Sequence, residues 1–131
     1  MAWESPGQIV TFPTTSTGIA RHRFVNVSTS GNLIYTVVNG NAVGVTQDGT
    51  THSTNQPTAL PVMISGISKL HVSTASTVGV GQTIAASSRG SAVPAAAASY
   101  AVGKVVAGTS GGAGRYVSVL IQPVGHSTAL V

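Results

Sequence analysis

The feature that most constrains this chain is its lack of charge. Only 6% of its residues are charged, and Glu4 and Asp48 are its two acidic residues, whereas roughly 25% of residues are charged in an ordinary soluble protein. The other polar residues are mostly Ser and Thr, and Val is the most abundant apolar residue. A disordered chain needs high net charge and few β-branched residues, and a helical bundle needs Leu, Glu, Lys and Gln. The composition therefore predicts an all-β protein.

Short β-rich runs alternate with turn-forming residues along the chain. Gly66 interrupts one apolar stretch and indicates a bulge or a sharp bend. The pairs Asn39-Gly40 and Asp48-Gly49 favour tight hairpins, so we expect a three-strand meander from residue 33 to about residue 53. The triplet Ser88-Arg89-Gly90 indicates a further hairpin. Strands at intervals of about ten residues are typical of a small β-sandwich or β-barrel. The expected strands are residues 23–27, 33–38, 42–47, 61–65, 67–72, 80–86, 91–93, 100–106 and 115–122.

The sequence divides into an extended N-terminal arm (residues 1–18), a β domain (residues 19–124) and a C-terminal tail (residues 125–131). Prolines and glycines interrupt regular structure in the arm, yet it carries the apolar residues Trp3 and Phe12. Two interpretations remain open: the arm straps onto a neighbouring molecule, or residues 9–12 form the first strand of the domain's own sheet. If the arm is a strap, deletion of residues 1–12 should leave a folded protein that no longer binds its partner.

The sequence shows no convincing active site. The absence of cysteine excludes thiolate metal sites and cysteine nucleophiles, and the two carboxylates lie far apart in the sequence. Residues 108–112 match G-x-S-x-G, but a strand is expected after them where a hydrolase has a helix. The four histidines show no metal-ligand spacing. We expect no enzymatic activity, no cofactor and no metal site; an esterase with Ser110 as nucleophile is the enzymatic alternative.

The basic residues also exclude some partners. The net charge is +4, but the bases are scattered, with Arg21-His22-Arg23 as the tightest group, and few aromatic residues lie near them. A nucleic-acid groove usually combines clustered bases with stacking aromatics. Residues 92–108 are weakly apolar but contain Pro94 and Lys104 and are too short to span a bilayer. The N-terminus shows no secretion signal. We therefore expect protein partners rather than nucleic acid or membrane.

The surface must be unusually poor in charge. A folded chain of 13.0 kDa exposes about 6,300 Å². Six basic and two acidic residues give roughly one charge per 800 Å², about one partner's share of a standard interface. Such a surface favours a subunit of an assembly, and a monomer kept soluble by hydroxyl groups is the alternative. The residues expected at an interface with a partner or another subunit are Trp3, Ile9, Val10, Phe12, Arg21, Arg23 and Phe24.

Five short segments, rich in Val and other small residues, follow one another along the second part of the chain. They read Ala-Val-Gly-Val-Thr-Gln from residue 42, Ser-Gly-Ile-Ser-Lys-Leu from residue 65, Val-Gly-Gln-Thr-Ile-Ala-Ala from residue 80, Ala-Val-Gly-Lys-Val-Val-Ala from residue 101 and Tyr-Val-Ser-Val-Leu-Ile from residue 116. Over residues 42–122 the chain thereby resembles the capsid decoration (cement) proteins of tailed bacteriophages.

The resemblance implies a structural virion protein that forms a homotrimer. Such a protein is made in the host bacterial cytoplasm, binds the major capsid protein on the outer capsid surface, and stabilises the icosahedral head. The family supplies no catalytic residues. The positive net charge of this chain suits an acidic capsid exterior and predicts salt-sensitive attachment. A phage tail or fibre subunit, or a secreted carbohydrate-binding or adhesin β domain, are the alternatives.

Overall fold

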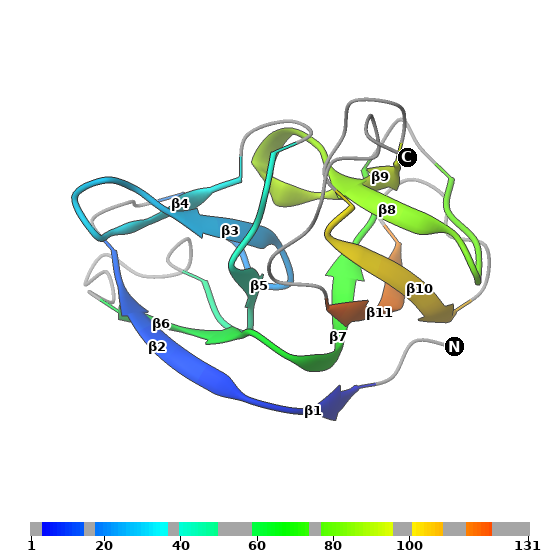
Figure 1. Cartoon of the computed structure of the whole chain (residues 1–131), viewed down its shortest axis with the longest axis horizontal. Coiled ribbons are helices and arrows are strands. Elements are labelled where there is room, and N and C mark those ends of the chain that lie inside the picture. Colours follow the sequence, from blue (N-terminus) through cyan, green and yellow to red (C-terminus); the bar gives the residue numbers. More distant parts are fainter. Residues whose placement is uncertain are drawn as a thin grey trace.

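The computed structural model describes residues 4–14, 18–36, 40–49, 59–73, 77–95, 101–108 and 115–121. In these residues the regular structure consists of β-strands and one short 3₁₀ turn, η1 (Ser88–Gly90), which confirms the predicted all-β fold. The strands form two antiparallel sheets (Figure 1), with the orders β1-β7-β11-β10-β8-β9 and β2-β6-β5-β3-β4. The strands are β1 (Ser5–Pro6), β2 (Ile9–Pro13), β3 (Phe24–Val27), β4 (Leu33–Tyr35), β5 (Gly44–Thr46), β6 (Ala59–Met63), β7 (Gly66–His71), β8 (Thr83–Ala86), β9 (Ala92–Pro94), β10 (Gly103–Ala107) and β11 (Tyr116–Ile121).

The main hydrophobic core joins the two sheets. Phe24 and Met63 come from the five-stranded sheet, and Leu70 and Val117 come from the six-stranded sheet. All four side chains are almost completely buried in one cluster. Full burial of such a side chain is worth about 1.5–3 kcal/mol. This cluster therefore holds the two sheets together.

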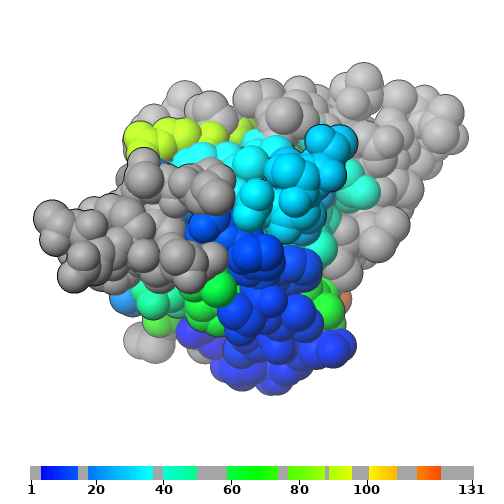
Figure 2. Space-filling model, turned by 90° about the vertical axis from the view of Figure 1, so that its left-hand side faces the viewer, coloured from blue at the N-terminus to red at the C-terminus, as the bar shows by residue number. Residues whose placement is uncertain are grey.

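A smaller core lies on the other face of the five-stranded sheet. Successive residues of a strand point to opposite faces, so Phe24 enters the main core and Val25 enters the smaller one, beside Leu60. The edge strands β2 and β4 approach each other around this core: the hydroxyl of Thr14, just after β2, donates a hydrogen bond to the carbonyl of Leu33 at 3.2 Å. Figure 2 shows the deep-blue atoms of the N-terminal strands beside the cyan atoms of β4. The five-stranded sheet is therefore strongly curled.

The first two strands follow β6 and β7 from one sheet into the other. β2 pairs along its length with β6, and β1 pairs with β7. At the corner the backbone N–H of Gly7 donates to the carbonyl of Ser65 at 3.2 Å. Gly66 has a φ of +102°, and a Cβ on it would meet the backbone nitrogen of Gly7. The bend predicted at Gly66 is confirmed, and residues 9–12 form a strand of the domain's own sheet, the second of the two interpretations.

The predicted meander over residues 33–53 is wrong. β5 lies between β3 and β6, while β4 is an edge strand on the other side of β3. The N–H of Val43 donates to the carbonyl of Val25 at 2.8 Å as the chain returns along β3. β5 also lies so close to β6 that a Cβ on Gly44 would meet the carbonyl of Met63. Packing between distant segments therefore outweighs the local turn signal.

Other predictions have mixed outcomes. The hairpin at residues 88–90 is confirmed, because β8 and β9 pair on either side of η1. Asn39, Trp3, residues 109–112 of the G-x-S-x-G match and the tail at residues 125–131 lie outside the described residues. No described segment forms a helix of the length and apolar character required to cross a bilayer.

Candidate interaction surface

Three predicted interface residues of the arm, Ile9, Val10 and Phe12, lie on the edge strand β2. Ile9 is 47% exposed on the outer side of this strand. Val10 and Phe12 are half-buried, and Phe12 packs against the smaller core. Trp3 lies outside the described residues. The part of the arm described by the structure thus offers an exposed backbone edge and Ile9, while Phe12 serves the fold.

Phe24 and Arg23 stabilise the junction between the sheets. The side chain of Phe24 is completely buried in the main core, so its predicted place at an interface is wrong: β3 is an internal strand, and its first residue points inward. Arg23 is half-buried. Its Nη1 donates to the carbonyl of Arg89 at 3.2 Å and to the hydroxyl of Ser91 at 3.1 Å. Arg23 therefore links β3 to the η1 turn of the other sheet.

The neighbouring residue His22 has an unusual backbone conformation. Its φ is +58°, in the left-handed region that non-glycine residues rarely adopt. Both backbone groups are engaged: its N–H donates to the carbonyl of Thr46 at 2.8 Å, and its carbonyl accepts from the N–H of His71 at 3.0 Å. These bonds fix the loop against β7. The imidazole ring then lies edge-on to Tyr116, with 5.6 Å between the ring centroids.

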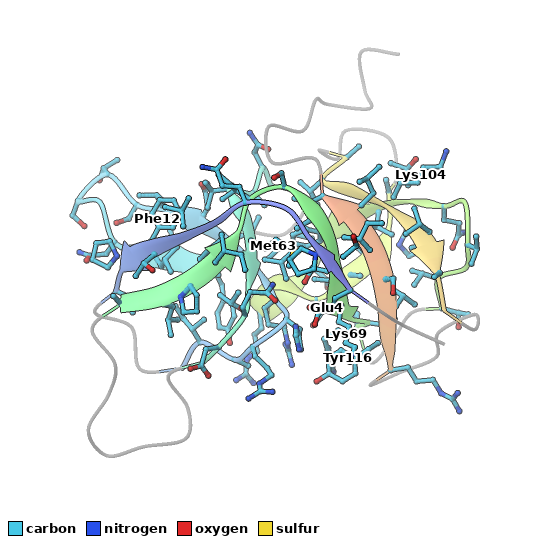
Figure 3. The ribbon with its side chains drawn as sticks, turned by 90° about the horizontal axis from the view of Figure 1, so that it is seen from below. Glu4, Phe12, Met63, Lys69, Lys104 and Tyr116 are labelled. Atoms are coloured by element: carbon cyan, nitrogen blue, oxygen red, sulfur yellow. The ribbon has the colours of Figure 1, made fainter. Side chains whose placement is uncertain are left out.

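A small pocket forms where this loop meets the six-stranded sheet. Its lining residues are Arg21, His22, Lys69 and Tyr116. β7 and β11 pair so that Tyr116 lies opposite His71, and the two rings are also in edge contact, at 5.6 Å between centroids. Figure 3 shows Lys69 and Tyr116 close together at one side of the molecule, far from Lys104. The pocket is therefore walled by side chains from two paired strands and one fixed loop.

The pocket carries an excess of positive charge. Arg21 is exposed and Lys69 is partly exposed. Glu4 lies beside Lys69 (Figure 3), but its Oε2 accepts from the backbone N–H of Lys69 at 3.4 Å and from the hydroxyl of Ser68 at 3.5 Å. Among the described residues no carboxylate forms an ion pair with Arg21 or Lys69. Two cations are thus left available beside a single carboxylate.

The two histidines of this region favour their neutral forms. Burial lowers the pKa of His22 below 6.5, with further lowering by Arg21 and Lys69 and an opposing effect of Glu4. Burial also lowers the pKa of His71, with a smaller contribution from Arg23. Near neutral pH the rings therefore contribute hydrogen-bonding atoms rather than charge.

The lowered pKa values predict that acid destabilises the protein. The unfolded chain binds more protons than the folded one once the pH falls below the ordinary histidine pKa of 6.5. The free energy of unfolding should therefore decrease as the pH falls from about 7 towards about 5, and level off below the folded pKa values. Urea denaturation at a series of pH values measures this, and the His22→Gln variant should show a shallower decrease. An unfolding free energy that rises over this interval contradicts the assignment.

The arrangement does not build a metal centre from the described residues. None of them form a group of three or more metal-ligating side chains. The rings of His22 and His71 are both in edge contact with the ring of Tyr116, although the two histidines are far apart in the sequence. The described residues therefore offer cations, neutral imidazoles and a phenol, a set suited to binding an anion.

Sequence reasoning found only part of this surface. It singled out Arg21 because that residue belongs to the tightest basic group, but it missed the pocket contributed by His22, Lys69 and Tyr116. Alternation along the expected strand at residues 67–72 places Lys69 and His71 on one face. The pairing of that strand with the last one, which brings Tyr116 to His71, has no local signal in the sequence.

Comparison with known proteins gives structural matches alone. No protein-family model matches the chain, and a comparison with curated protein sequences gives no match. Among solved structures, the chain is similar to the N base of the head fibre protein gp8.5 of bacteriophage phi29, with a TM-score of 0.66 and 15% identity, over 92% of this chain and 99% of that chain.

A second phage protein has the same architecture. The C-terminal fragment of bacteriophage phi29 gene product 12 matches with a TM-score of 0.59 and 11% identity, over 88% of this chain and all of that fragment (100%). The pre-mature form of gene product 12 matches with a TM-score of 0.56 and 10% identity, over 93% of this chain and 23% of that chain. The chain thus has a fold that occurs in bacteriophage virion proteins, including the base of a phage head fibre.

Proposed function

We propose that this protein is a structural component of a bacteriophage virion that binds the outside of the head. In this proposal it forms a homotrimer, contacts the major capsid protein and stabilises the shell. The observation that carries the proposal is the match to the base of a head fibre, which extends over 92% of this chain and 99% of that chain. A match over nearly the whole of both chains indicates a common domain fold rather than a shared hairpin.

The composition of the surface supports the same proposal. The whole chain has six basic and two acidic residues. Because desolvation of charges is costly, a surface with so few charges can form wide contacts at a low cost. Repeated sites on a symmetric shell raise the effective concentration of each subunit, so individually weak contacts suffice. The exposed β2 edge with Ile9 and the basic pocket on the six-stranded sheet are the two surfaces that we propose for these contacts.

A fibre subunit is the second candidate. The matched structure is the base of a head fibre, and a fibre base and a decoration protein both bind a head. They differ in what they carry and in how many sites they occupy. Decoration saturates all equivalent lattice positions, whereas a fibre base occupies a subset of them and supports a projecting shaft.

Mixing the purified protein with undecorated phage heads tests the proposal. We expect a trimer by size-exclusion chromatography with light scattering, and co-sedimentation with heads. Because the chain is basic, binding should be several-fold weaker at about 500 mM salt than at about 50 mM. Saturation of all lattice positions in electron micrographs favours decoration, and sparse occupancy favours the fibre base. A monomer that does not bind heads at any salt concentration contradicts both the decoration role and the fibre-base role.

A further inference from the structure

The pocket beside Tyr116 contains hydrogen-bond donors that the fold does not use. The guanidinium of Arg21 and the ammonium of Lys69 have no ion-pair partner among the described residues. His22 forms part of the pocket wall; its Nδ1 atom has no hydrogen-bond partner among the described residues, but it is buried and does not face a ligand directly. Tyr116 is 43% exposed and adds a hydroxyl donor.

The backbone that carries this pocket is fixed before any ligand arrives. Lys69 and Tyr116 stand on two strands that pair over five residue pairs. His22 is held by its two backbone hydrogen bonds in a left-handed conformation. Strained conformations of this kind persist only where the surrounding structure enforces them, and they are concentrated at binding sites. The arrangement is therefore preorganised, which lowers the entropic cost of binding.

The charge of the pocket suits one negative group. Arg21 and Lys69 contribute two positive charges, and Glu4, beside Lys69, contributes one negative charge. The next arginine in the sequence, Arg23, is engaged with the η1 turn. A nucleic-acid site needs many phosphate contacts to gain affinity, and the pocket holds two cations in a volume of about 200 Å³.

Glu4 shows how a carboxylate fits next to this pocket. Its Oε2 lies 3.4 Å from the backbone nitrogen of Lys69, on the same strand as the pocket wall. At this distance the hydrogen bond is weak, since strong charge-assisted bonds measure about 2.7–2.9 Å. The carboxylate of Glu4 therefore leaves the cationic ends of Arg21 and Lys69 open to a second acidic group.

We propose that the pocket of Arg21, His22, Lys69 and Tyr116 binds a single Asp or Glu carboxylate on the surface of the protein that this chain docks onto. Arg21 and Lys69 supply the charge, and Tyr116 supplies a neutral donor. The site rests on the proposed function only for the origin of the carboxylate, a capsid protein side chain. The chemistry of recognition follows from the pocket alone and is measurable without a virion.

The first test uses the full-length protein and a small probe. N-acetyl-glutamate α-amide, which carries one carboxylate, is titrated into isotope-labelled protein while the side-chain NMR signals of His22 and Tyr116 are followed. N-acetyl-glutamine α-amide is the matched neutral probe. We expect saturable shifts with the acid alone, and about tenfold weaker binding in the Arg21→Gln/Lys69→Gln variant, the effect of removing charge-assisted hydrogen bonds. The Lys104→Gln variant loses the same kind of charge on a distant part of the sheet and should bind as the wild type does.

Three results overturn the carboxylate site. One is the absence of saturable shifts at His22 and Tyr116, and another is equal shifts with the neutral probe. The third is a single-stranded oligonucleotide that shifts the same signals at much lower concentration than the acid, which assigns the pocket to a polyanion. The comparison of the two probes on the wild-type protein needs no variant, so it remains decisive even if the double variant folds poorly.

The second test separates the pocket from the proposed function. Heads are mixed with the wild type, with Arg21→Glu/Lys69→Glu and with Lys104→Glu. Loss of binding in the pocket variant alone supports the inference. If the pocket variant binds heads as well as the wild type, the docking role of the pocket is wrong while the proposed function stands. If the wild type does not bind heads but binds the acidic probe, the proposed function is wrong and the carboxylate site is supported.

Discussion

Replacing Gly90 with alanine should cost about 2–5 kcal/mol of unfolding free energy, a large share of the 5–15 kcal/mol typical of a small domain. Gly90 has a φ of +70°, and a Cβ on it would meet the carbonyl oxygen of Phe24 and lie 2.8 Å from the backbone nitrogen of that residue. The obstacle is backbone, which cannot rotate away as a flexible side chain can. The loss should therefore exceed the cost of the left-handed conformation alone.

Gly81 provides a matched control for this substitution. Its φ is +92°, but a Cβ on it would have no atom within 4 Å. Gly81→Ala should therefore cost only the conformational penalty, about 1–2 kcal/mol. Urea denaturation of both variants measures the difference, which is the steric cost of placing a Cβ between η1 and β3. Equal losses in the two variants would show that the backbone there moves to accommodate the Cβ at no cost.

Deleting residues 1–12 should destabilise the protein severely, or prevent its folding. The structure revises the expectation from the sequence that this deletion leaves the fold intact. The deletion removes β1 and most of β2, and with them the pairing along the edge of β6. It also removes Phe12 from the smaller core and uncovers Leu60. Circular dichroism and thermal denaturation measure the outcome; a variant with the wild-type melting temperature contradicts the role of β2 in the sheet.

Two point substitutions separate folding from docking on the same strand. Phe12→Ala removes a side chain that packs on the smaller core and should cost about 2–3 kcal/mol, less than a fully buried Phe. Ile9 is 47% exposed, so Ile9→Thr should change the unfolding free energy by no more than about 0.5 kcal/mol. If Ile9→Thr nevertheless weakens head binding, the outer side of β2 contacts the partner.

The sequence predicted most of the strands, but not β1 and not the pairing of the strands. Runs of β-branched residues bounded by glycine identify strands locally, and the turn at residues 88–90 formed as expected. The pairing of β5 with β3 and β6 depends on the close fit at Gly44 against a segment far along the chain. No local pattern contains that information, and the Asn39-Gly40 signal favoured the wrong neighbour.

The candidate site shows the same limit for a different reason. Three consecutive residues, Arg21, His22 and Arg23, form one cluster in the sequence but have three different roles: a pocket cation, a ring in edge contact with Tyr116, and a link to η1. The backbone turn at His22 separates them. The sequence places Phe24 next to the basic group and so among the expected interface residues, and only the internal position of β3 shows that it is buried.

The path of the N-terminal strands has a consequence for biosynthesis. β1 and β2 pair with β7 and β6, so β2 has no partner until residues 59–63 have left the ribosome, and β1 has none until residues 66–67 have left it. Pairings over such sequence separations make folding slow. Until the pairing forms, an unpaired strand edge can associate with other chains. β1 and β2 must therefore stay unpaired while β3, β4 and β5 are synthesised, and β1 gains its partner only when β7 of the six-stranded sheet has formed.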